Sequence, residues 1–448
     1  MDIRSRKLLN GLFSGFGFFS ISLLAASLII ILTPIFVNGI GAFIFKGTIE
    51  FRKFNFEQFN RGEKEELFKE INKVSKSRMY IYNLISNFEK QIENEELPNS
   101  YKYEEDLREI KTYLHELMGP FPNESPPVMM RDRYGATRWE KAKEIRDRIL
   151  FVEKWDYSIK ESMGKKVLTP RINGFKGTTL EHLFPYLEKN LKKITEPKLT
   201  FYWNFFSDKS FDSHLFGGIG PELLGTLYLV LGTMIFAIPI GIISAIYLTE
   251  FAKPGKIINF INISIGTLAG VPSIVFGLFG LAFFIMTVKV SDSKSVLAGS
   301  LTLALLVLPT IIRASEEALK SVPKTYKEAA LSLGAGEIFT IFRVILPAAL
   351  PGILTGIVIS MGRAAGETAP IIFTAAVSIG NPLKLFETLS QPTPALSWNI
   401  YNLVTEHESV ESIRHVQYGM VFALVLLVLA LNLTAIIMRA KISKKLRG

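Results

Sequence analysis

Apolar residues gather in six long runs along the chain, at residues 12–37, 223–248, 269–288, 296–312, 353–377 and 420–438. A helix needs roughly 20 mainly apolar residues to cross the hydrocarbon core of a bilayer. Each run is therefore predicted to be a membrane-spanning helix. Because an even number of crossings returns the chain to its starting side, both termini are expected on one face. The pattern predicts an all-α, polytopic membrane protein with six transmembrane helices.

Residues 46–216, between the first two runs, are instead rich in Lys, Glu, Asn and Tyr. Two stretches of this segment repeat apolar residues every three or four positions, as amphipathic helices do. They comprise Leu67, Ile71, Val74, Ile81, Leu84, Ile85, Phe88 and Ile92, and then Tyr103, Leu107, Ile110, Leu114 and Leu117. Leu97 and Pro98 separate the two stretches, which predicts an antiparallel helical pair.

A third helix of this segment is predicted from Thr137 to Trp155, and the signals weaken beyond Met163. We expect Trp139 and Trp155 to be packing residues rather than a platform for a ligand. The segment is thus predicted to be a mostly helical insertion, and its residues assign no chemistry to it.

Basic residues cluster beside four of the six runs. They are Arg4, Arg6 and Lys7, then Lys253 and Lys256, then Lys320, Lys324 and Lys327, and finally Lys441, Lys444, Lys445 and Arg447. If every run crosses the membrane, all four clusters fall on one face, which the positive-inside rule identifies as the cytoplasm. The first run is longer than the apolar part of a signal peptide, so we expect an uncleaved anchor.

The predicted organisation has four parts. They are a cytoplasmic tail with the first span at 1–45, an extracytoplasmic insertion at 46–216, a transmembrane domain at 217–440, and a cytoplasmic tail at 441–448. The net charge of +10 partly reflects the basic clusters at the membrane. We therefore expect contact with lipid, and the charge gives no reason to expect a nucleic acid partner.

Composition excludes several kinds of chemistry. The chain contains no cysteine, and its five histidines, at 115, 182, 214, 407 and 415, lack the spacing of metal ligands. It also lacks the glycine-rich loop with Lys and Ser or Thr that binds nucleotide phosphates. We therefore expect no catalytic residue, metal or cofactor in this chain, and any ATP must be hydrolysed by another protein.

The stretch YKEAALSLGAGEIFTIFRVILP, from Tyr326 to Pro347, lies between two predicted spans. Glu328, Ala329, Ala330 and Gly334 in it match the spacing of the EAA loop, through which permeases of ABC importers dock on an ATPase. Val344 departs from that pattern, which usually has isoleucine there.

This spacing also makes physical sense for docking. We expect Glu328 in the first turn of a helix, the two alanines to allow close approach, and Gly334 to let the chain bend into a second short helix. The coupling loop is predicted at 314–347. The alternative is a simple polar linker between two spans.

Two opposite charges, Arg363 and Glu367, lie inside the fifth run. Charges at that depth are costly and usually face a protein interior or a water-filled path. Their spacing of four residues puts them on one helix face, where they can pair. Gly366 is expected to permit close helix contact, and Pro370 to free a backbone carbonyl. The alternative is an ion pair with a purely structural role.

Several strings, at 217–252, 269–284, 301–336 and 346–377, together resemble the PstA-type permease subunits of bacterial phosphate ABC importers. The resemblance is dense over 217–380 and does not cover most of residues 46–216. It implies the fold of a type I ABC importer permease. It also implies that Arg363, Glu367, Thr368 and Arg313 lie on the substrate pathway, although Arg313 is equally compatible with an anchor at the membrane interface.

The resemblance implies a permease that moves inorganic phosphate across the bacterial inner membrane, without enzymatic activity of its own. Its expected partners are a second permease resembling PstC, an ATPase dimer resembling PstB, and a phosphate-binding protein resembling PstS. One alternative is a permease for sulfate or molybdate. Another is a membrane receptor, which the short predicted cytoplasmic segment at 313–351 disfavours.

Overall fold

The computed structural model describes residues 3–94, 100–156, 165–406, 410–411 and 413–446. The chain forms two compact units, which we call the membrane unit (Met1–Ala42 with Asn204–Gly448) and the inserted unit (Phe43–Trp203). The insertion had been predicted to end at residue 216, whereas the inserted unit ends 13 residues earlier. Residues 204–219 belong to the membrane unit because backbone groups of Phe205 and Asp208 bond those of Ile219 and Gly220.

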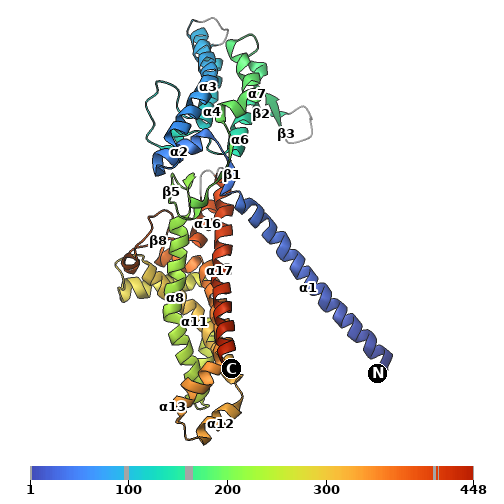
Figure 1. The fold of residues 1–448 in the computed structure, drawn as a ribbon, viewed down its shortest axis with the longest axis vertical. Coiled ribbons are helices and arrows are strands. Elements are labelled where there is room, and N and C mark those ends of the chain that lie inside the picture. Colours follow the sequence, from blue (N-terminus) through green and yellow to red (C-terminus); the bar gives the residue numbers. More distant parts are fainter. Residues whose placement is uncertain (1–2, 95–99, 157–164, 407–409, 412, 447–448) are drawn as a thin grey trace. The chain divides into compact units, whose positions relative to one another are not determined.

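Helices make up most of the membrane unit (Figure 1). They are α1 (Ile3–Ile40), α8 (Gly220–Ile246), α9 (Lys256–Leu268), α10 (Ser273–Gly280), α11 (Val296–Lys320), α12 (Lys324–Ser332), α13 (Glu337–Thr340), α14 (Leu346–Gly366), α15 (Ala369–Thr374), α16 (Leu396–Thr405) and α17 (Arg414–Leu446). The short strands β5 (Ser210–Phe211) and β6 (Phe216–Gly217) pair, as do β7 (Ala376–Val377) and β8 (Thr393–Pro394).

Five helical stretches of the described residues are long and apolar enough to cross a membrane, or six if one bent pair counts as a span. The bent pair joins α9 to α10 and the π-helical turn Leu281–Thr287 at an angle of 104°. The sequence had predicted a single run at 269–288 here. Pro272 cannot donate a helical hydrogen bond and disfavours helix before it, so the chain bends there.

Contacts between helices show that this bent pair has to cross. In α8, Gly232 faces Ser300 and Gly241 faces Ile311, so α8 and α11 run in the same direction. The chain between them must therefore return across the membrane. Along α14 the contacts with α11 come in the reverse order, because Gly352 faces Ala318 and Gly356 faces Ala314. α14 therefore runs antiparallel to α11. The structure thus agrees with the six predicted crossings.

Two predicted boundaries are wrong. The fifth span had been predicted at 353–377, but a 30-residue stretch begins at Glu337 and ends at Gly366, and α15 is a separate helix. The coupling loop had been predicted at 314–347, but α11 continues to Lys320, and the helical stretch of the next candidate span begins at Glu337. Hydropathy marks where apolar residues stop, whereas a helix can extend beyond them. The π-helical turn Ile341–Ile345 precedes Pro347 and keeps the backbone helical up to it.

The inserted unit contains helices and two strand pairs. Its elements are β1 (Ile44–Gly47), α2 (Ile49–Phe59), α3 (Lys64–Glu93), α4 (Ser100–Met118), α5 (Met130–Arg133), α6 (Trp139–Leu150), β2 (Phe151–Asp156), β3 (Lys165–Pro170), α7 (Leu183–Thr195) and β4 (Lys198–Phe201). The predicted antiparallel pair is confirmed as α3 and α4, because Phe88 contacts Tyr103 while Arg78 bonds the Met118 carbonyl. Leu97 and Pro98 lie outside the described residues.

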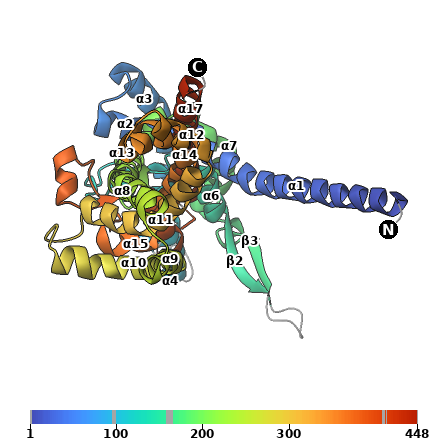
Figure 2. The ribbon, with the colours of Figure 1, turned by 90° about the horizontal axis from the view of Figure 1, so that it is seen from below.

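The third predicted helix of the inserted unit is too long. It ends at Leu150, and residues 151–156 form β2, which pairs with β3 in a ribbon that extends from α6 (Figure 2). Trp139 packs against the core as expected, whereas Trp155 lies on the ribbon with 56% of its surface exposed. The helix α7 was not predicted, although its buried leucines, Leu183, Leu187 and Leu191, repeat every four residues.

A buried arginine ties four segments of the inserted unit together. Arg78 of α3 forms an ion pair of 2.8 Å with Glu50 of α2, and both side chains are at most 10% exposed. The same guanidinium donates to the carbonyls of Met118 and Ile194, at 2.9 Å each. Removing one partner of such a pair costs about 3–5 kcal/mol because the other charge stays buried.

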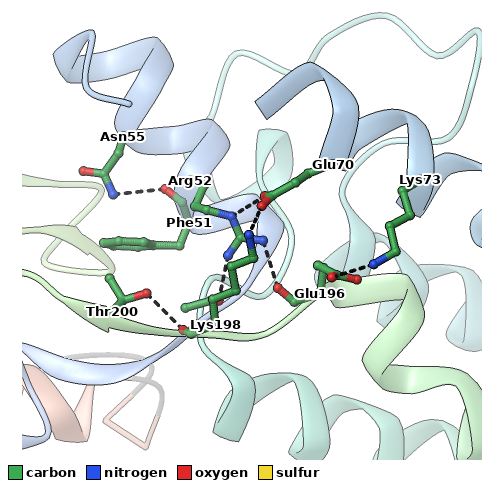
Figure 3. A network of polar contacts seen from close by, with 9 residues as sticks. Phe51, Arg52, Asn55, Glu70, Lys73, Glu196, Lys198 and Thr200 are labelled. Carbon is green, nitrogen blue, oxygen red and sulfur yellow. Dashed lines mark hydrogen bonds and ion pairs between the residues drawn. The ribbon is translucent and has the colours of Figure 1, made fainter. Parts of the chain in front are cut away.

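The two ends of the inserted unit meet in a short antiparallel pairing. Ile44 pairs with Phe201 and Gly47 with Lys198. Beside this pairing Arg52 donates to the Gly47 carbonyl at 3.0 Å and to the Glu196 carbonyl at 2.8 Å (Figure 3). One guanidinium therefore holds both ends of the unit.

Glu70 completes this network. It accepts from Arg52 Nε at 2.6 Å and forms an ion pair with Lys198 (Figure 3). Burial alone would raise the pKa of Glu70, but the hydrogen bonds and charges of Lys198 and Arg52 outweigh it and hold the pKa below the usual 4.5. The carboxylate therefore stabilises the folded unit above pH 4.5, and this contribution is lost as the pH falls through the lowered value.

We predict that Glu70→Gln weakens the paired ends by about 1 kcal/mol at neutral pH, because the ion pairs are lost. Backbone amides of β1 and β4 should exchange with solvent deuterium about five times faster in the full-length variant. The difference from the wild type should shrink as the pH falls and Glu70 protonates. Glu188→Gln, an exposed change in α7, is the control, and a pH-independent difference would contradict the prediction.

A second prediction concerns the seam where Gly356 faces Ala314. A Cβ on Gly356 would lie 2.3 Å from the Ala314 Cβ, so Gly356→Val should push α11 and α14 apart. We expect a loss of about 1–3 kcal/mol, seen as a lower melting temperature in detergent. Gly366→Ala in the same helix is the control, because a Cβ there meets nothing within 4 Å. Equal melting temperatures for both variants would refute the close packing.

Candidate functional site

The coupling stretch forms the helix α12 and a bend at Gly334, as predicted, but the second helix is not short, because α13 continues through the π-helical turn into α14. α12 ends at Ser332, Gly334 adopts φ +85°, and α13 begins at Glu337. A left-handed backbone of this kind suits glycine, which explains why the chain can turn here. A second detail was wrong: the first turn of α12 contains no acidic residue, because the helix begins at Lys324 and Glu328 is its fifth residue.

The surface of α12 and α13 is open. No residue of α12 is buried, and Glu328 and Ala329 are exposed while Ala330 is half-buried. Large apolar side chains are exposed beside them, namely Leu333, Ile338 and Phe339 at 89%, 67% and 58%. Both helices lie at one end of the membrane unit (Figure 1). An exposed mixture of apolar and charged side chains at a tip is the kind of surface that receives another protein.

Arg363 and Glu367 form the predicted ion pair, with 3.2 Å between Nε and Oε1. The geometry differs from the prediction, because α14 ends at Gly366 and Glu367 is extended. Arg363 therefore lies in the last turn of the helix, where a cation is favoured by the helix dipole. Its side chain is 39% exposed and that of Glu367 is 19% exposed. Within this chain the pair is accessible to a small anion.

Two further expectations about this segment were wrong. Gly366 makes no close helix contact, since a Cβ there would meet nothing within 4 Å. Pro370 lies in the first turn of α15, where its missing N–H is not needed. The backbone is therefore opened by the break between α14 and α15, rather than by the proline within a helix.

The break at Glu367 and Thr368 is held by α16. Thr368 Oγ1 donates to the Ser397 carbonyl at 3.4 Å, and Ser397 Oγ donates to the Glu367 carbonyl at 3.0 Å. The bond from Ser397 satisfies a carbonyl that the helix break leaves free, and the bond from Thr368 ties the break to α16. Sequence reasoning missed Ser397, because a lone serine 30 residues away carries no pattern that links it to the break.

Arg313 lies elsewhere. Its guanidinium donates to the Asn262 carbonyl at 2.6 Å and pairs with Glu316 at 3.0 Å. Ala314 faces Gly356, which precedes Arg363 by seven residues or about 10 Å along the helix. The structure therefore does not bring the two arginines together. The contacts of Arg313 match those of an anchor between α9 and α11, and a pathway role remains a prediction.

A second buried polar cluster was missed from the sequence. His214 Nε2 lies 2.9 Å from Glu222 Oε1, and Asn399 Nδ2 donates to the same oxygen at 3.3 Å. All three residues are at most 3% exposed. The cluster joins the start of α8 to α16. In the described parts of the chain, no group of three or more His, Asp or Glu side chains could hold a metal ion.

Comparison with known proteins shows which family the chain resembles. Residues 237–448 match the family model described as "Binding-protein-dependent transport system inner membrane component". The chain is 33% identical over 257 residues to "Probable ABC transporter permease protein YqgI" of Bacillus subtilis (strain 168), a match that covers 54% of this chain and 85% of the relative.

A relative in Mycobacterium tuberculosis (strain ATCC 25618 / H37Rv) is "Phosphate transport system permease protein PstA 1". It is 35% identical over 231 residues, covering 52% of this chain and 72% of the relative. A solved structure of the MetNI methionine ABC transporter in inward facing conformations matches with a TM-score of 0.37 and 17% identity, over 50% of this chain and 94% of that one. On the sequence matches, the chain belongs to the family of binding-protein-dependent transport system inner membrane components, among the PstA-type permeases.

Proposed function

We propose that this chain is a permease subunit that carries inorganic phosphate into the cell in an ATP-driven importer. The observation that supports this most directly is the exposed ion pair of Arg363 and Glu367 at a helix break in the membrane unit. Similarity to PstA permeases supports phosphate as the cargo.

The proposal includes an orientation in the membrane. The basic clusters at both termini and around α12 favour the cytoplasm for that end of the membrane unit. The coupling surface on α12 and α13 would then face an ATPase, and the inserted unit would lie outside. The inserted unit has no assigned role in transport.

The chemistry of phosphate fits the ion pair. The Arg363 guanidinium can bind two anion oxygens in a fork, which suits phosphate and sulfate alike. Near neutral pH, phosphate still carries at least one O–H, which the Glu367 carboxylate can accept. Sulfate has no such proton and would meet only repulsion. The two side chains also pair with each other, with 3.2 Å between Nε and Oε1. Thr368 offers a hydroxyl beside them, and Arg313 is a second cation nearer the cytoplasm.

The partners follow from this function. The chain would pair with a second permease resembling PstC, and the two would dock on an ATPase dimer resembling PstB, which hydrolyses ATP. A phosphate-binding protein resembling PstS would deliver the anion. A permease for sulfate or molybdate is the alternative, and the exclusion of sulfate by Glu367 distinguishes the two.

We predict that Arg363→Gln abolishes phosphate uptake by the reconstituted complex, since the anion loses its forked donor. Glu367→Gln should lower phosphate uptake about tenfold and admit sulfate, because the amide no longer repels it. Uptake of radiolabelled anions into vesicles measures both. The system should transport without the binding protein, which could select the anion upstream. Sulfate that stays fully excluded in Glu367→Gln would leave the pair with a structural role only.

We also predict that Gly334→Ser lowers the phosphate imported for each ATP hydrolysed. A serine at φ +85° is strained by about 1–2 kcal/mol, which should change how α13 follows α12. Gly336→Ser is the matched control, because Gly336 has φ −71° and precedes α13, where serine is favoured. If both variants couple as well as the wild type, the bend at Gly334 is not needed for coupling.

A further inference from the structure

We propose that α8 is the rigid connector between the coupling helix α12 and the helix break at Glu367, and that the ion pair of Lys327 with Glu250 joins α12 to it. This inference rests on the proposed function, because it assigns a route by which ATPase movement reaches the transported anion. Lys327 and Glu250 are then positioning residues, which touch neither anion nor nucleotide.

The contact with α12 is short and specific. Lys327 Nζ lies 2.6 Å from Glu250 Oε2, in a pair separated by 77 residues in the chain. The Glu250 side chain is only 11% exposed and that of Lys327 is 34% exposed. A carboxylate so well shielded from water depends strongly on its cation.

Besides its packing against the π-helical turn Ile341–Ile345 and its link in the chain to α11, α12 has one polar attachment to the spans in the part of the chain that the structure describes. Among the described residues, no other α12 side chain forms an ion pair or a hydrogen bond with another element. No residue of α12 is buried. Lys327 also stands directly before Glu328, the first residue of the docking motif. Displacement of α12 by a bound ATPase would therefore act directly on Glu250.

Glu250 belongs to the π-helical turn Tyr247–Phe251, which continues α8 without interruption. α8 is 27 residues long and runs beside α11 for most of that length, as the contacts of Gly232 and Gly241 show. From Glu250 to Glu222 the helix covers about 42 Å, at 1.5 Å per residue. Pro239 inside α8 lacks one helical hydrogen bond, so the close packing against α11 on both sides of it, at Gly232 and Gly241, is what would carry movement along the helix.

The far end of α8 is bonded to α16. Asn399 donates to Glu222 at 3.3 Å, and the Leu396 N–H donates to Thr226 Oγ1 at 2.9 Å. The next residue, Ser397, donates to the Glu367 carbonyl at 3.0 Å. An unbroken series of contacts thus runs from Lys327 through α8 and α16 to the backbone beside Arg363. A shift of α8 would change the geometry of the Arg363–Glu367 pair.

The experiment uses the complete reconstituted importer, with ATPase and binding protein present. We would compare Lys327→Glu, Glu250→Lys and the double reversal Lys327→Glu with Glu250→Lys. Three quantities are measured for each: anion uptake, ATP hydrolysis stimulated by the loaded binding protein, and the amount of ATPase that co-purifies. Lys256→Glu in α9 and Glu317→Lys in α11 are controls, since both side chains are exposed outside the coupling surface and form no ion pair among the described residues.

We expect each single reversal to lower uptake per ATP at least fivefold, with normal co-purification of the ATPase, and the double reversal to regain at least half of it. The controls should couple normally. The proposal is overturned if single reversals couple as well as the wild type, or if the double reversal is no better than either single one. Where a reversal prevents assembly, Lys327→Gln and Glu250→Gln decide, and normal coupling in both overturns the proposal.

Failure of the proposed function would look different. If the wild-type complex carries sulfate or molybdate instead of phosphate, the cargo assignment fails. The same variants scored on that anion still test the connector, because the ratio of uptake to hydrolysis does not depend on which anion is carried.

Discussion

Inside a bilayer every backbone N–H and C=O needs a partner within the protein, and this constraint decides where the membrane unit can depart from regular helix. In the described helical stretches that could cross a membrane, the departures are the bend between α9 and α10, the π-helical turns, and the break at Glu367 and Thr368 where one stretch ends. At the break, the Ser397 side chain donates to the Glu367 carbonyl, and the Thr368 side chain donates to the Ser397 carbonyl of α16. Irregular backbone in such a setting marks a place where an ion or a polar group can be received.

The second constraint on the membrane unit is distance between helices. In lipid, helices associate through close packing rather than through exclusion of water. Gly352 and Gly356 in α14 face Ala318 and Ala314 in α11, and Gly241 in α8 faces Ile311. Small residues at these points bring three helices together along a shared surface of α11. With the helices this close, a charged side chain can bond to a neighbouring helix as well as to its own. Arg313 of α11, for example, bonds Asn262 of α9 and pairs with Glu316 of α11.

The sequence predicts the number of spans, the helix α12 and the bend at Gly334 well, because hydropathy and the spacing around Gly334 depend on local composition. It predicts the ends of helices poorly. α11 passes beyond its apolar run to Lys320, and α14 stops at Gly366 inside an apolar run. Contacts between distant residues are not encoded in any local pattern, so the bonds of Glu250 with Lys327 and of Glu222 with His214 became visible only in the structure. The strand β2 was missed because Phe151 and Trp155 also fit a helical repeat.

The antiparallel pairing of β1 with β4 has a consequence for how the chain folds. Gly47 and Lys198 are partners, so the long segment between them closes on itself. The entropic cost of closing a loop grows only with the logarithm of its length, and a loop of about 150 residues costs about 2.4 kcal/mol more than one of ten. Favourable contacts within the inserted unit offset this loop-closure entropy. The membrane helices before and after the unit in the chain, α1 and α8, are then joined as if by a short hairpin turn. They can assemble without first closing a long disordered connection.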